Sequence, residues 1–164
     1  MKNNTKLGML LAIIGIIAGL LSLYLISDTY NSVIHTHFNA GDWEESNTVR
    51  LVYAILGWLG TTAGAISVAV LWGFIKKQDW AWFWGTVSAT ILLLAGFFPM
   101  IPAMDSGLPV PTVAVFILAA IMWFGMLLIG GVNKKIIWLT FTAGLAYVLT
   151  FIDGVAPISK FQTT

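Results

Sequence analysis

The sequence contains no cysteine and very few charged residues. Of its 164 residues, 8 are lysine or arginine and 7 are aspartate or glutamate. The absence of cysteine excludes disulfides, thiolate catalysis, iron–sulfur clusters and zinc sites with cysteine ligands. A soluble domain carries about a quarter charged residues, whereas this chain carries 9%. The deficit of charge excludes a soluble globular domain.

Runs of basic residues and catalytic motifs are missing as well. The net charge is +1, and no basic run is longer than two residues. Binding to nucleic acid needs a concentrated basic surface, so we expect no nucleic-acid partner. The sequence has no phosphate loop, dinucleotide fingerprint, nucleophile elbow or zinc-protease motif. These absences favour a role other than that of an enzyme.

Five long intervals contain no charged residue, and together they hold 116 residues. They are residues 7–27, 51–75, 80–104, 106–133 and 136–152. A helix of about 20 apolar residues spans the hydrocarbon core of a bilayer, where every backbone polar group must be satisfied inside the helix. The sequence therefore predicts an all-α polytopic membrane protein, a five-helix transmembrane bundle that forms a single membrane domain. The predicted helices cover about 7–26, 49–75, 80–98, 112–132 and 136–152.

The distribution of basic residues predicts the orientation of the chain. If it crosses the bilayer five times, one side receives Lys2, Lys6, Lys76, Lys77, Lys134 and Lys135. The other side receives only Arg50 and Lys160. Because cytoplasmic loops carry an excess of lysine and arginine, we expect a cytoplasmic N-terminus and a C-terminus outside. The predicted location is the cell membrane, as a multi-pass protein.

Two outer segments are predicted between the spans. The longer one is an outer loop over 28–48, in which Tyr30, Val33, Ile34, His37 and Phe38 recur at helical spacing. This spacing predicts a short amphipathic helix over 29–38 that lies on the membrane or caps the bundle. The shorter one, residues 99–111, holds four prolines, which predict an irregular connection.

His35 and His37 are the two histidines of the chain and fall within the predicted outer loop. Imidazole is a good ligand for zinc, copper, iron or nickel, so one interpretation is a transition-metal site on the outer face. An extended segment would turn both side chains the same way, whereas a helix would separate them by about 200°. The alternative is that both are solvated residues at the membrane interface. Apart from this metal, the sequence leaves any cofactor unknown.

Small residues recur four positions apart in three of the predicted helices. They are Gly15 and Gly19, Gly60 and Gly64, and Gly85 with Ala89. Such spacing lets helix backbones approach closely and gain van der Waals contact that lipid does not supply. We therefore predict that these five glycines are helix-packing positions. A further pair of alanines, Ala65 and Ala69, suggests that the helix over 49–75 is central.

No aspartate, glutamate, lysine, arginine or histidine lies in the central part of any predicted span. Ionisable groups inside a membrane usually mark ion pathways or proton relays, so their absence argues against an ion-coupled pump and against an intramembrane acid–base enzyme. Three functions stay open. The first is a non-catalytic accessory or scaffolding subunit, partnered by other membrane subunits or by copies of itself. The second is a binder or carrier of a lipophilic or uncharged molecule within the bundle, and the third is an outer-face metal-binding protein that uses His35 and His37.

Overall fold

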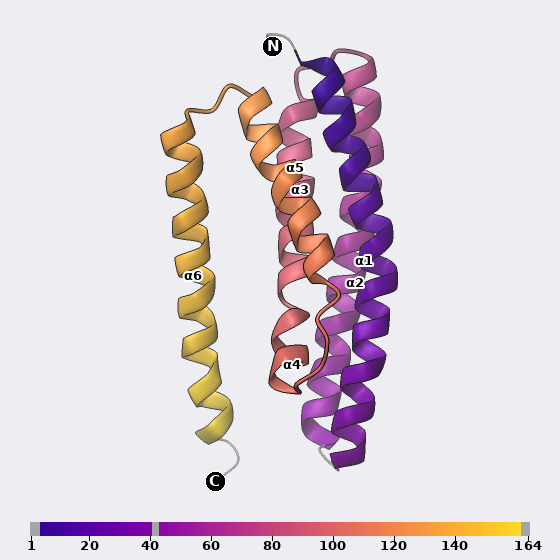
Figure 1. Ribbon diagram of the computed structural model, residues 1–164, viewed down its shortest axis with the longest axis vertical. Helices are drawn as coiled ribbons and strands as arrows, with labels where there is room; N and C mark the ends of the chain where they lie inside the picture. The colour runs from indigo at the N-terminus through magenta and orange to yellow at the C-terminus, as the bar shows by residue number, and fades with distance from the viewer. Residues whose placement is uncertain (1–3, 41–42, 162–164) are drawn as a thin grey trace. The chain divides into compact units, whose positions relative to one another are not determined.

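The computed structural model describes residues 4–40 and 43–161, and it places side chains over 4–36 and 50–150. Within these residues the chain forms helices and no strand, which confirms the all-α prediction. The helices are α1 (Thr5–Ala40), α2 (Trp43–Ile75), α3 (Ala81–Phe97), α4 (Met100–Asp105), α5 (Val113–Ile129) and α6 (Lys134–Phe161) (Figure 1). They belong to two compact units, Met1–Gly130 with α1 to α5 and Gly131–Thr164 with α6.

Three stretches are long and apolar enough to cross a membrane. They are Thr5–Thr36, Arg50–Ile75 and Ala81–Asp105. The apolar helix α5 has 17 residues and is shorter than these three. The three stretches support the assignment of the chain to a membrane, while crossings by α5 and α6 stay predictions.

The predicted outer loop over 28–48 is wrong wherever the structure describes that segment. α1 continues to Ala40 and α2 begins at Trp43, so the two helices form a long antiparallel hairpin (Figure 1). The amphipathic pattern over 29–38 belongs to the last part of α1 and not to a separate helix on the membrane surface. Neither glycine nor proline occurs between Gly19 and Gly41. Nothing therefore stops the helix at the point where the apolar run ends.

The connection after α3 is partly helical, in contrast to the irregular segment predicted over 99–111. α3 ends just before Pro99, which has no backbone N–H to continue the helix. The chain then forms the six-residue helix α4. The non-helical residues of the connection are Phe98, Pro99 and the stretch from Ser106 to Thr112, in which Gly107 takes a positive φ of 65°. A single proline thus divides an otherwise continuous apolar stretch into two helices.

Gly19 and Gly64 mark the closest approach of α1 and α2. A Cβ added to Gly64 would lie 3.0 Å from the Cα of Gly19, and one added to Gly19 would overlap the backbone of Gly64. At Gly60, one turn away, the space for a side chain is filled by the Cβ and Oγ of Ser22. The two helices therefore pack backbone against backbone at this level.

The other two predicted packing glycines make room for methionine side chains of α5. A Cβ on Gly85 would lie 2.7 Å from Sδ of Met126, and one on Gly15 would overlap Sδ of Met122. Both methionines are fully buried. Glycines outside the predicted motifs are confined as well, among them Gly96 against the backbone of Phe116 and Gly125 against the side chain of Leu11. Small residues thus allow close packing among α1, α2, α3 and α5.

Candidate functional site

A buried group of two hydroxyls joins α2 to α3 near the Gly19–Gly64 contact. Oγ of Ser67 and Oγ of Ser88 lie 2.8 Å apart. Both oxygens lie within hydrogen-bond distance of the carbonyl oxygen of Ala63, at 3.0 Å for Ser67 and 2.7 Å for Ser88. Each hydroxyl carries one hydrogen, and the group offers enough acceptors to use both. The pair therefore links two helices and has no hydrogen left for a ligand.

Further hydroxyls in the apolar helices bond to their own backbone. Each donates to a carbonyl oxygen three or four residues earlier, as seen for Ser22, Thr61, Thr86 and Thr90. This is the usual local bond of serine and threonine in a helix. A carrier of polar or uncharged molecules would need such groups directed into a path. Among the described side chains, these hydroxyls are already engaged within the fold.

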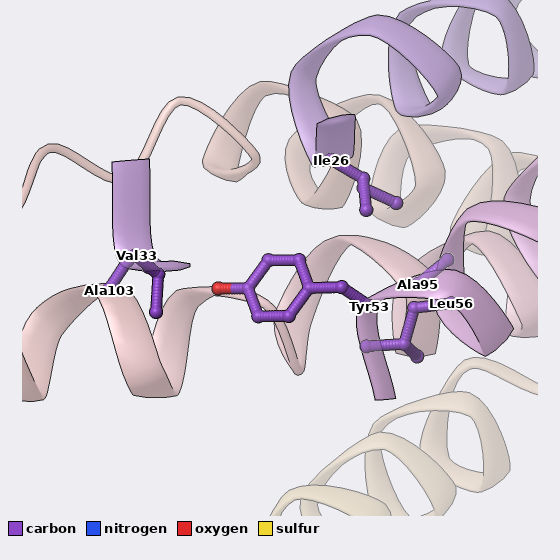
Figure 2. Packing of buried hydrophobic residues seen from close by; sticks show 6 residues of the cluster. All are labelled: Ile26, Val33, Tyr53, Leu56, Ala95 and Ala103. Atoms are coloured by element: carbon purple, nitrogen blue, oxygen red, sulfur yellow. The ribbon is translucent and has the colours of Figure 1, made fainter. Parts of the chain in front are cut away.

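Tyr53 of α2 is the centre of a buried apolar cluster at the other end of the first unit. The cluster contains Ile26, Val33, Tyr53, Leu56, Ala95 and Ala103. Figure 2 shows the Tyr53 ring extending toward Val33 and Ala103. Only 2% of Tyr53 is exposed, and its hydroxyl donates to the carbonyl oxygen of Pro99 at 2.7 Å. The same ring packs against the ring of Tyr30, with centroids 6.0 Å apart.

An open groove of about 630 Å³ follows the surface of α1 and α2 beside this cluster. We call it the α1–α2 groove. It is lined by Leu23, Ile26, Ser27 and Tyr30 of α1 and by Arg50, Tyr53, Ala54, Gly57, Trp58 and Thr61 of α2. Arg50 is exposed and forms no ion pair with any side chain that the structure places. The groove therefore combines one exposed cation with a largely apolar wall.

A second surface pocket, of about 460 Å³, lies between α2 and the start of α3. Its lining consists of Ile66, Ala69, Val70, Trp80 and Trp84. No charged or hydroxyl side chain takes part, so the pocket offers packing area without a group that could orient a polar ligand. Of the two, the α1–α2 groove is the better candidate for recognition.

The predicted metal site at His35 and His37 is not assembled by the described residues. His35 is exposed on α1, and the side chain of His37 lies outside the described residues. Because the backbone is helical through both positions, they are separated by about 200° around the helix axis. The part of the chain with placed side chains contains no group of three or more histidine, aspartate or glutamate residues that could hold a metal. Metal binding at these histidines stays a prediction.

Comparisons of the chain with protein-family models, with curated proteins and with solved structures find no match. Inferences about function therefore rest on the geometry of the chain itself.

Proposed function

We propose that this protein is a non-catalytic accessory or scaffolding subunit of a membrane complex. In this proposal five helices cross the cell membrane, with the N-terminus in the cytoplasm and the C-terminus outside. The partners are other membrane subunits or further copies of this chain. Three features support the proposal: long apolar helices, no aspartate, glutamate, lysine, arginine or histidine in their central parts, and a buried Ser67–Ser88 pair that joins two helices.

The length of the α1–α2 hairpin is the observation that carries the proposal. α1 has 36 residues and α2 has 33, which correspond to about 54 and 50 Å of helix. The hydrocarbon core of a bilayer is about 30 Å thick. If Lys6 and Lys76 lie in one headgroup layer, about 20 residues of each helix reach the opposite boundary near positions 26 and 56. The rest, residues 27–40 and 43–55, is the hairpin extension, which would rise about 20 Å above the hydrocarbon.

The charges of the first unit fit this placement. Lys6 and Lys76 lie at one end of the α1–α2 pair, where Gly8 packs against the ring of Phe74. Asp28 lies on α1 beyond the predicted boundary, and Asp105 ends α4, whose Ala103 packs in the Tyr53 cluster. Positive charge is thus concentrated at one end and negative charge at the other, as expected if the lysine end faces the cytoplasm.

The hairpin extension has a packed interior, and its exterior differs between the two helices. Val33 and Tyr53 are buried within it, whereas Asn31, Ser32, His35 and Thr36 are exposed. On α2 the exterior of the extension is apolar, because Leu51, Val52 and Ile55 are exposed. An exposed apolar patch of this kind marks a surface that a protein partner can cover. Such an element can hold a partner at a fixed height above the membrane.

The proposal is tested by measuring what surrounds the chain in its native membrane. The complex is extracted in polymer-bounded lipid discs, and its protein mass is compared with the 17.8 kDa of one chain. In parallel, a photo-crosslinking amino acid replaces Ser32 or Thr36, with Lys77 at the opposite end as the matched control. We expect a stoichiometric assembly and a discrete adduct from position 32 or 36. A solitary chain with no adduct from either position would contradict the proposal.

A further inference from the structure

We propose that the α1–α2 groove binds one anionic phospholipid of the leaflet that surrounds the Arg50 end of the bundle. The inference rests on the proposed depth of the hairpin in the membrane and is independent of the scaffolding role. It assigns a chemical class to a surface that has one cation and the hydroxyls of Ser27 and Tyr30 at one end and a long apolar wall. The volume of about 630 Å³ lies within the range of about 300 to 1,000 Å³ typical of ligand sites.

The groove runs across the predicted boundary between hydrocarbon and headgroups. That boundary falls near positions 26 of α1 and 56 of α2. Leu23 and Thr61 line the groove on the hydrocarbon side, and Ser27 and Arg50 line it on the headgroup side. An occupant must therefore place an apolar chain at one end and a polar group at the other, as a membrane lipid does.

The chemistry at the headgroup end favours a phosphate with net negative charge. Arg50 is exposed and unpaired among the side chains that are placed, and guanidinium binds phosphate through two parallel hydrogen bonds. The hydroxyls of Ser27 and Tyr30, from the facing helix, are further donors on the same lining. A zwitterionic lipid offers the same phosphate but adds a cation that Arg50 repels. Charge complementarity thus selects the anionic headgroup.

The hydrocarbon end has the shape that an acyl chain needs. Gly57 contributes no side chain, and a Cβ added there would meet only Cγ2 of Ile26 at 4.0 Å. Trp58 beside it is 75% exposed, and indole rings prefer the level of the membrane interface. The missing side chain at position 57 leaves open space between α1 and α2, in contrast to the filled space at Gly60. A larger residue at position 57 would occupy that space without disturbing the helix contact.

The test measures which lipids stay bound to the purified full chain. The protein is equilibrated with equal amounts of phosphatidylglycerol and phosphatidylcholine in mild detergent, and retained lipids are counted by native mass spectrometry. We expect the wild-type chain to retain phosphatidylglycerol preferentially, and Arg50→Gln to lower that preference about fivefold, the effect of one basic residue near an anionic lipid. Lys6→Gln, which removes one charge at the opposite end, is the matched control and should preserve the preference.

A second variant tests the apolar end of the groove. Gly57→Leu should reduce retention of both lipids by filling the space for the chain. Gly144→Leu is its control, because a Cβ at position 144 meets nothing within 4 Å and the residue does not line the groove. Circular dichroism and elution volume verify that each variant is folded. The proposal is overturned if Arg50→Gln keeps the wild-type ratio, or if Gly57→Leu retains as much lipid as Gly144→Leu.

Discussion

The hydroxyl of Tyr53 donates a hydrogen bond to the carbonyl oxygen of Pro99, 2.7 Å away. This bond joins α2 to the break between α3 and α4, two parts of the chain separated by 46 positions. It is buried, and the Tyr53 ring lies in the cluster that holds α1, α2 and the α3–α4 segment together (Figure 2). Tyr53 thus fixes the position of α4 relative to the hairpin extension.

Removal of the Tyr53 hydroxyl should destabilise the protein less than removal of its ring. Tyr53→Phe should lower the free energy of unfolding by about 1 kcal/mol, because one buried hydrogen bond is lost. Tyr53→Ala should lower it by about 3 to 5 kcal/mol, because a cavity replaces the aromatic ring. Reversible unfolding of the purified protein in mixed detergent and dodecyl sulfate micelles measures both values. Equal effects of the two substitutions would show that the ring contributes nothing to packing.

The contact between Gly19 and Gly64 should not tolerate a side chain. Gly64→Leu must separate α1 from α2, because the group that a new Cβ meets is the backbone of Gly19. We expect a loss of about 1 to 3 kcal/mol, the range for overpacked interiors. Gly144→Leu is the matched control and should not lower stability, because position 144 is open and leucine favours a helix interior more than glycine does. The free energy of unfolding of both variants is measured in the same mixed-micelle assay. A Gly64→Leu variant as stable as Gly144→Leu would refute the close approach of Gly19 and Gly64.

The Ser67 and Ser88 hydroxyls should be energetically coupled. A double-mutant cycle with Ser67→Ala and Ser88→Ala should give an interaction energy of about 0.6 kcal/mol and at most about 1.7 kcal/mol, the range for hydrogen bonds between membrane helices. Thr29→Ala paired with Ser88→Ala serves as the control cycle. Thr29 bonds to Leu25 within its own helix, so its effect should add to that of Ser88. If the destabilising effects of Ser67→Ala and Ser88→Ala were also strictly additive, the two hydroxyls would not share a hydrogen bond.

The sequence predicted the helices that the bilayer requires, but not where the longest ones end. The apolar run from Leu7 to Ile26 predicts the part of α1 that a bilayer can hold. A helix stops only at a residue that disfavours it, and none occurs before Gly41. The polar residues from Asp28 onward predict a loop only if the end of the apolar run is also the end of the helix. The structure continues the helix through Asp28 to Ala40, so a polar residue alone does not end a helix.

The candidate site could be predicted only in part, for a related reason. Glycine spacing indicated Gly15, Gly19, Gly60, Gly64 and Gly85 as packing positions, because a four-residue repeat is visible along one helix. The confinement of Gly96 by Phe116 depends on how α3 and α5 cross, and no local pattern carries that information. The α1–α2 groove brings Ser27 and Arg50 onto one surface, and their proximity follows from the hairpin that the sequence interpretation had replaced by a loop.

Placement of the α1–α2 hairpin across the membrane is the central claim, and single cysteines test it most directly. The chain has no cysteine of its own, so Ser32→Cys in the hairpin extension and Gln78→Cys in the α2–α3 turn each provide a unique thiol. Both positions are exposed. A membrane-impermeant maleimide applied to intact cells should label Ser32→Cys at once and Gln78→Cys only after the membrane is permeabilised. Labelling of both thiols in intact cells, or of Gln78→Cys alone, would contradict the account.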